Sequence, residues 1–144
     1  TMISDTAYLL KECNAGCRMA TNSLQQAISH ADDQRLCDLL HKYDLKHREI
    51  KEGCDALLNK IGEEKDEPHP FARAFAWMGT EMKLTFRDDD SAVAGMMMDG
   101  CSMGIKSLSR YLNQYSDASQ ESRDLARKLI RMEEDFLVEL GHYM

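Results

Sequence analysis

The chain has 144 residues, which is enough for one domain with a substantial hydrophobic core. Hydrophobic residues make up 43% of the sequence and charged residues 30%, a balance typical of a globular soluble protein rather than a disordered one. The net charge of −7 argues against nucleic acid or an anionic membrane as the main partner, because either would require a basic face.

The cysteines indicate a reducing compartment. Five cysteines, at positions 13, 17, 37, 54 and 101, are an odd number and include no Cys-x-x-Cys pair. No apolar run approaches the length of a membrane-spanning helix, and the first residues lack the pattern of a signal peptide. We therefore expect a cytoplasmic protein in which the cysteines act mainly as small hydrophobic residues.

The first two predicted helices span residues 4–30 and 34–61. Apolar and small residues recur along both at alternating steps of three and four, which is the pattern of an amphipathic helix. Asp32 and Asp33 place carboxylates at the start of the second helix, and Gly62 follows its end. The second helix has the most regular apolar face, formed by Leu36, Leu40, Tyr43, His47, Ile50, Cys54, Leu57 and Ile61.

A charged segment with two prolines, residues 63–70, interrupts the helical pattern. A shorter amphipathic helix is predicted at 70–86, and longer helices at 90–115 and 119–142. The links within each pair of long helices are short, whereas the segment that joins the pairs is long. The pattern predicts one all-α domain over 1–144: an antiparallel four-helix bundle of two hairpins, with an extra shorter helix in the crossover and with the helices at 34–61 and 90–115 parallel. If the helix at 70–86 packs as an equal member, the bundle has five helices.

Folding each hairpin at its turn predicts which side chains share the middle of the bundle. Cys17 should meet His47, and Cys13 should lie near Ile50 and Cys54. In the second hairpin Cys101 should meet Met132 and Glu133. The expected middle layer consists of Cys13, Cys17, His47, Cys101 and Met132, with Met98 close by.

At this level the chain resembles the ferritin-like superfamily, in particular its small bacterial bundles of two helical hairpins. Iron-binding members supply a Glu from each of two helices and a Glu-x-x-His from each of the other two. Residues 44–47, Asp-Leu-Lys-His, match one such motif with Asp for Glu. Elsewhere the chain departs from the pattern: Glu12 neighbours the apolar face of its helix, and Glu133 is followed by Phe136 where a histidine is required. The resemblance therefore implies a ferritin-like bundle without an intact di-iron centre.

Two interpretations of the function remain open. In the first, His47 is a core histidine whose ring nitrogens bond to Asp44, to a neighbouring carboxylate or to water, and the chain is a non-catalytic interaction or structural module. In the second, iron, zinc or copper binds a degenerate interior site formed by Asp44, His47, Glu133, Cys17 and Cys101. No catalytic residue, resident cofactor or small-molecule substrate can be identified.

Three further expectations concern the thiols and the glycines. Cys13, Cys17 and Cys101 could form a thiolate pocket for a soft ion such as Cu(I), although core packing produces the same spacing. A thiol-redox role would require an exposed cysteine of low pKa, and only Cys37 lies away from the apolar faces. Glycines at 95, 100 and 104 permit a close helix–helix contact, within the chain or across a dimer, and we expect a homodimer.

Overall fold

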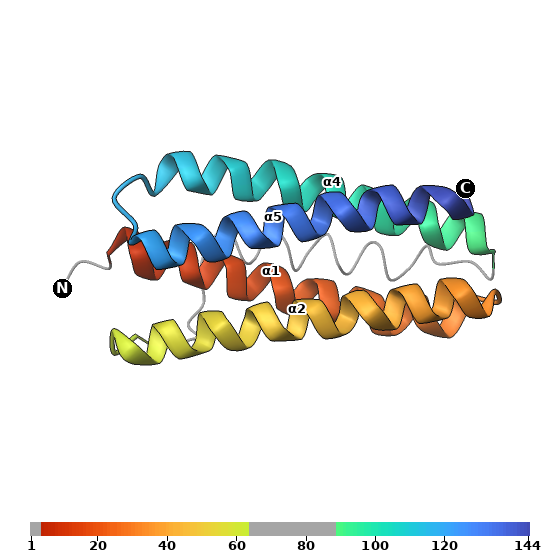
Figure 1. The fold of residues 1–144 in the computed structure, drawn as a ribbon, viewed down its shortest axis with the longest axis horizontal. Helices are drawn as coiled ribbons and strands as arrows, with labels where there is room; N and C mark the ends of the chain where they lie inside the picture. The colour runs from red at the N-terminus through yellow and green to blue at the C-terminus, as the bar shows by residue number, and fades with distance from the viewer. Residues whose placement is uncertain (1–3, 64–88) are drawn as a thin grey trace.

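The computed structural model describes residues 4–63 and 89–144, and this part of the chain forms four long helices and no strand (Figure 1). The helices are α1 (Asp5–His30), α2 (Gln34–Lys60), α4 (Asp90–Gln114) and α5 (Gln120–Leu140), followed by a 3-10 turn, η1 (Gly141–Tyr143). The prediction of an all-α chain with these four helices is confirmed, with each end within two residues of its expected place. The helix predicted at 70–86 lies outside the described residues.

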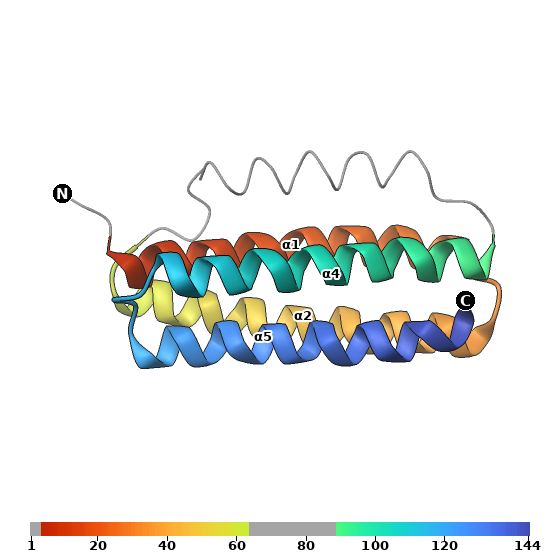
Figure 2. The ribbon, with the colours of Figure 1, turned by 90° about the horizontal axis from the view of Figure 1, so that it is seen from above.

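The four helices lie side by side as a bundle (Figures 1 and 2). α1 packs against α2 and α4, and α5 packs against α4 and α2. Each of these four neighbouring pairs is antiparallel, whereas α2 and α4 run in the same direction, as the hairpin argument predicted (Figure 2). The four-helix bundle is thus built from two hairpins joined by a long connection.

Side chains cap the starts of α1, α2 and α5, and the cap at α2 was predicted. Asp33 accepts a hydrogen bond from the backbone N–H of Arg35 at the start of α2, and Ser4 and Ser119 play the same role for α1 and α5. At the end of α2, Gly62 has a φ of +76°, a left-handed conformation that residues with a Cβ rarely adopt.

Hydrogen bonds at both ends of the bundle tie one hairpin to the other. The carboxylate of Asp90, in the first turn of α4, accepts from the backbone N–H groups of Asp32 (2.8 Å) and Asp33 (3.1 Å) in the α1–α2 turn. At the opposite end, Asp5 of α1 accepts from the backbone N–H of Asp117 (3.0 Å) in the α4–α5 turn. The two turns therefore help to set the relative position of the hairpins.

The buried faces of α2 and α4 differ in part from the strict three-and-four pattern. On α2 the last buried apolar residue is Leu58, whereas Ile61, predicted to be buried, is 45% exposed. On α4, Met97 is buried in place of the expected Met98. For α2 the reason is that a straight helix has 3.6 residues per turn, so a 3.5-residue pattern rotates by about 20° per heptad. On α4 the following positions of the pattern, Cys101 and Leu108, are buried as predicted. In the described ranges no helix is both long enough and apolar enough to cross a bilayer.

Replacing Asp90 with Ala should lower the free energy of unfolding by about 1–2 kcal/mol, because the substitution leaves two backbone N–H groups of the α1–α2 turn without their charged acceptor. Urea denaturation followed by circular dichroism measures this change. Asp99→Ala, at an exposed position of the same helix, is the matched control and should change stability by less than about 0.5 kcal/mol. Equal effects of the two substitutions would contradict the assigned role of Asp90.

Candidate functional site

His47 lies at the centre of the bundle and is 1% exposed. Its Nδ1 is 2.6 Å from the backbone carbonyl oxygen of Tyr43, one turn earlier on α2. Because a carbonyl oxygen can only accept a hydrogen bond, Nδ1 must carry a proton. Nε2, the other ring nitrogen, is paired with Oε1 of Glu133 on α5. Both nitrogens of the buried ring thus have partners within the protein.

The pairing with Glu133 determines the charge of His47. Burial lowers the pKa of the imidazole, but the hydrogen bond and the negative charge of Glu133 raise it and outweigh burial, so the net pKa lies above the usual value. The protonated ring, paired with a carboxylate, is favoured. A metal ion at Nε2 would have to displace both the proton and Glu133.

Cys101 of α4 joins this pair through Glu133, as the folding of the second hairpin predicted. Burial raises the pKa of the Cys101 thiol, and the charge and hydrogen bond of Glu133 raise it further. The thiol therefore stays protonated and donates to the carboxylate. We call His47, Glu133 and Cys101 the central cluster; it connects α2, α5 and α4.

The central cluster lines a cavity of about 80 Å³ between the helices. The remaining wall is mostly apolar and includes Met97, Leu108 and Leu129. Glu12 of α1 also lines the cavity, so all four helices contribute a polar or thiol group to its wall.

Glu12 is a site residue that the sequence reasoning placed beside the apolar face, whereas the structure buries it to 1% exposure. Burial raises the pKa of its carboxyl group to about 7, and hydrogen bonding of Tyr111 only partly opposes this shift. Residues 12, 16, 19–20 and 23 of α1 all line the cavity, at helical spacing. This second face of α1, rich in small residues, is the signal that could have identified Glu12.

Asp44 belongs to a different contact. Its Oδ2 accepts from the side-chain amide of Gln25 on α1 (3.2 Å) and from Arg48 (3.0 Å). Among the residues that the structure describes, its other oxygen, Oδ1, is buried without a hydrogen-bond partner. His47 thus bonds to Glu133 and not to Asp44, although both acids were predicted to share its site.

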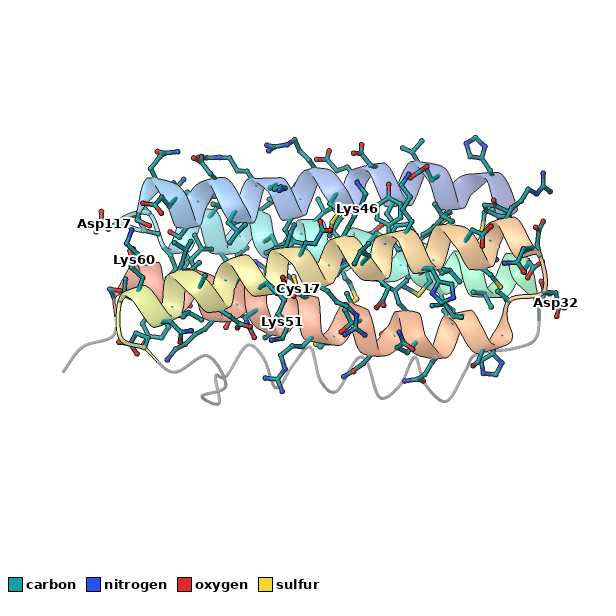
Figure 3. All side chains as sticks on the ribbon, turned by 60° about the horizontal axis from the view of Figure 1, so that its bottom comes forward. Cys17, Asp32, Lys46, Lys51, Lys60 and Asp117 are labelled. Carbon is teal, nitrogen blue, oxygen red and sulfur yellow. The ribbon has the colours of Figure 1, made fainter. Side chains whose placement is uncertain are left out.

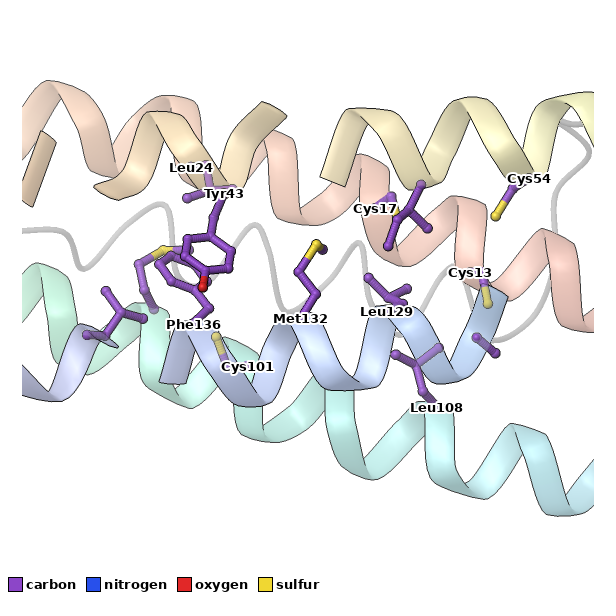
Figure 4. Packing of buried hydrophobic residues seen from close by; sticks show 14 of the residues in the cluster. Cys13, Cys17, Leu24, Tyr43, Cys54, Cys101, Leu108, Leu129, Met132 and Phe136 are labelled. Atoms are coloured by element: carbon purple, nitrogen blue, oxygen red, sulfur yellow. The ribbon is translucent and has the colours of Figure 1, made fainter. Parts of the chain in front are cut away.

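Cys17 lies among other thiols. Burial raises the pKa of Cys17, and so do the nearby Cys54 and Glu133. Cys54 also interacts with Cys13, the neighbour that the first hairpin predicted for it. Cys17 is therefore near Glu133, but it belongs to a group of three thiols between α1 and α2 (Figure 4).

Cys37, the one cysteine predicted to lie away from the apolar faces, is half-buried, and its thiol donates to the carbonyl oxygen of Ala31 at 3.4 Å. Burial and the surrounding aspartates raise the pKa of this thiol. A raised pKa lowers the thiolate fraction, which is the opposite of what a thiol-redox role requires.

The predicted metal set is thus brought together only in part. His47, Glu133 and Cys101 form one cluster whose polar atoms bond to one another, while Asp44 and Cys17 make other contacts. Within residues 4–63 and 89–144, no three His, Cys, Asp or Glu side chains form a group that could hold a metal ion. Phe136, three residues after Glu133, stacks on Tyr43 with ring centroids 4.2 Å apart.

No model of a known protein family matches this chain, and no curated protein does so either.

Replacing Glu12 with Gln should make the protein more stable at pH 8 and leave its stability at pH 4.5 almost unchanged. The folded state holds the Glu12 proton more tightly than the unfolded state, so stability is highest below pH 4.5 and falls as the pH rises to about 7. The shift corresponds to about 3 kcal/mol of unfolding free energy, which Gln removes because it does not ionise.

Urea denaturation between pH 4.5 and 8 tests this, with Glu49→Gln on the exposed face of α2 as the matched control. A difference between Glu12→Gln and the natural chain that does not change with pH would contradict the ionisation argument.

Proposed function

We propose that the chain is a non-catalytic helical bundle of ferritin-like type, an interaction or structural module of the cytoplasm that forms a homodimer and lacks an intact di-iron centre. The observation that carries this proposal is that the polar atoms of the central cluster bond to one another. His47 uses both ring nitrogens for bonds within the protein, and Glu133 is shared between His47 and Cys101. These groups have the contacts that a buried core histidine requires.

The connectivity supports the ferritin-like part of the proposal. Two antiparallel hairpins are joined so that α2 and α4 run parallel (Figure 2). Glu12 of α1, His47 of α2 and Glu133 of α5 line one cavity at the middle of the bundle, which is where iron-binding bundles place their ligands. Cys101 on α4 and Phe136 on α5 stand where further ligands would be needed.

The surface between α2 and α5 supports the interaction part. Lys42 of α2 and Glu139 of α5 form an ion pair across these helices, with 3.5 Å between Nζ and Oε1. Two exposed apolar side chains flank this pair in the sequence: Leu45, one turn from Lys42, and Val138, next to Glu139. They are 59% and 70% exposed and offer apolar surface to a second copy of the chain.

A second candidate function is metal binding at the degenerate interior site. It is favoured by one observation, namely that His47, Glu133 and Cys101 come together from three helices at a cavity wall. Glu12 would be a further oxygen ligand, in addition to the Asp44 and Cys17 that the sequence suggested. Binding would require loss of the proton on Nε2 of His47 and rearrangement of Glu133.

Elemental analysis of the protein purified without added metal separates the two candidates. We expect iron and zinc far below one equivalent per chain, and the same thermal melt with and without chelator. In His47→Gln the metal content should be equally low, and the chelator should again leave the thermal melt unchanged. Stoichiometric iron or zinc that disappears in His47→Gln would contradict the leading proposal and establish the second.

A further inference from the structure

Three thiols gather between α1 and α2, at a place that the central cluster does not use. Cys13 and Cys17 are one turn apart on α1, so their side chains share a face, and Cys54 stands opposite on α2. All three are completely buried. Cys54 hydrogen-bonds with Cys13, and Figure 4 shows these two thiols opposite each other, with Cys17 further along α1.

A polar layer lies directly beside these thiols. Asp55, the residue after Cys54, accepts from the side chain of Asn14 and from Lys51, whose Nζ is 2.9 Å away. The positive charge of Lys51 acts on Cys17, and Figure 3 shows the two residues near each other at the α1–α2 contact. The thiol group is thus bordered, at Cys17, by the ion pair of Lys51 and Asp55.

We propose that Cys13 and Cys54 form a binding site for Cu(I) between α1 and α2. Cys17 lies one turn away from Cys13 on α1. Thiolates are soft ligands that select Cu(I) over harder ions. Cu(I) is satisfied by two thiolates in a linear arrangement, so this site does not need three converging ligands. The site is separate from the pair formed by His47 and Glu133 and does not depend on whether that pair binds a metal.

The binding step is a ligand exchange without electron transfer. The S–H bonds of Cys13 and Cys54 break, two S–Cu bonds form, and two protons leave to solvent. The bound unit carries one negative charge. At the neighbouring Cys17, the charge of Lys51 favours a negative unit, whereas Asp55 and Glu133 oppose it. The mutual interaction of Cys13 and Cys54 and their burial raise the pKa of Cys13, so its thiol stays protonated until the metal displaces the proton.

The site lies close to the open end of the first hairpin. Cys54 is six residues before Lys60, the last residue of α2, which is about 9 Å along the helix. Helix ends open more readily than helix centres. Opening of this end gives a copper complex access to the thiols without disrupting the central cluster.

Anaerobic titration of the reduced full chain with the Cu(I)–bicinchoninate complex tests the proposal. The protein should withdraw about one Cu(I) per chain, develop ultraviolet thiolate-to-copper absorption and release about two protons per metal ion. Cys13→Ala and Cys54→Ala should each weaken Cu(I) binding by more than about 100-fold. The reason is that loss of a residue that bonds directly to the metal costs more than loss of a residue that only supports a ligand, which costs about 10- to 100-fold. Cys37→Ala and His47→Gln are the matched controls and should bind as the natural chain does.

Failure of the natural chain to withdraw Cu(I) would overturn the proposal, as would unchanged uptake by Cys13→Ala and Cys54→Ala or its loss in Cys37→Ala. Circular dichroism establishes that each variant is folded. X-ray absorption of the natural chain gives an answer that does not depend on the variants, because the proposal requires sulfur ligands alone. A nitrogen ligand whose signal disappears in His47→Gln would assign copper to the central cluster instead and overturn the assignment to the thiols.

Discussion

A buried histidine must have partners for two ring nitrogens, and this requirement connects the two halves of the molecule. The carbonyl of Tyr43 satisfies one nitrogen from within α2, while the other requires Glu133 of α5, which belongs to the second hairpin. Glu133 also bonds to Cys101, so one carboxylate joins three helices. Breaking a buried charged pair by removing one partner costs about 3–5 kcal/mol, more than any single surface contact in the bundle contributes.

The same pairing shapes the functional proposal. A bundle that binds two metal ions needs several carboxylates directed at one point, whereas the carboxylate of Glu133 is already engaged by His47 and Cys101. Stacking of Phe136 on Tyr43 fills the neighbouring level with aromatic side chains. Glu12, on the other wall of the cavity, holds its proton up to about pH 7 because of its burial. The polar groups that line the cavity are thus bonded as in a protein core, while the thiols between α1 and α2 form a separate group.

The sequence predicted the helices and hairpins well because they depend on local periodicity, caps and short turns. It also predicted that Cys101 meets Glu133 and that Cys13 lies near Cys54, since folding a hairpin at its turn aligns residues by simple counting. Glu12 was missed because α1 packs against two neighbours and a single apolar face accounts for only one of them. The partner of His47 was left open because Asp44 and Glu133 share its level, and the choice depends on side-chain directions that spacing does not determine.

Nitrogen-15 NMR of the His47 ring, in protein prepared without added metal, tests the central claim most directly. The account predicts that at neutral pH both ring nitrogens carry slowly exchanging protons, with Nδ1–H donated to Tyr43 and Nε2–H to Glu133, and that a chelator leaves the spectrum unchanged. An Nε2 without a proton, whose chemical shift moves when a chelator is added, would show a metal ligand and contradict the account.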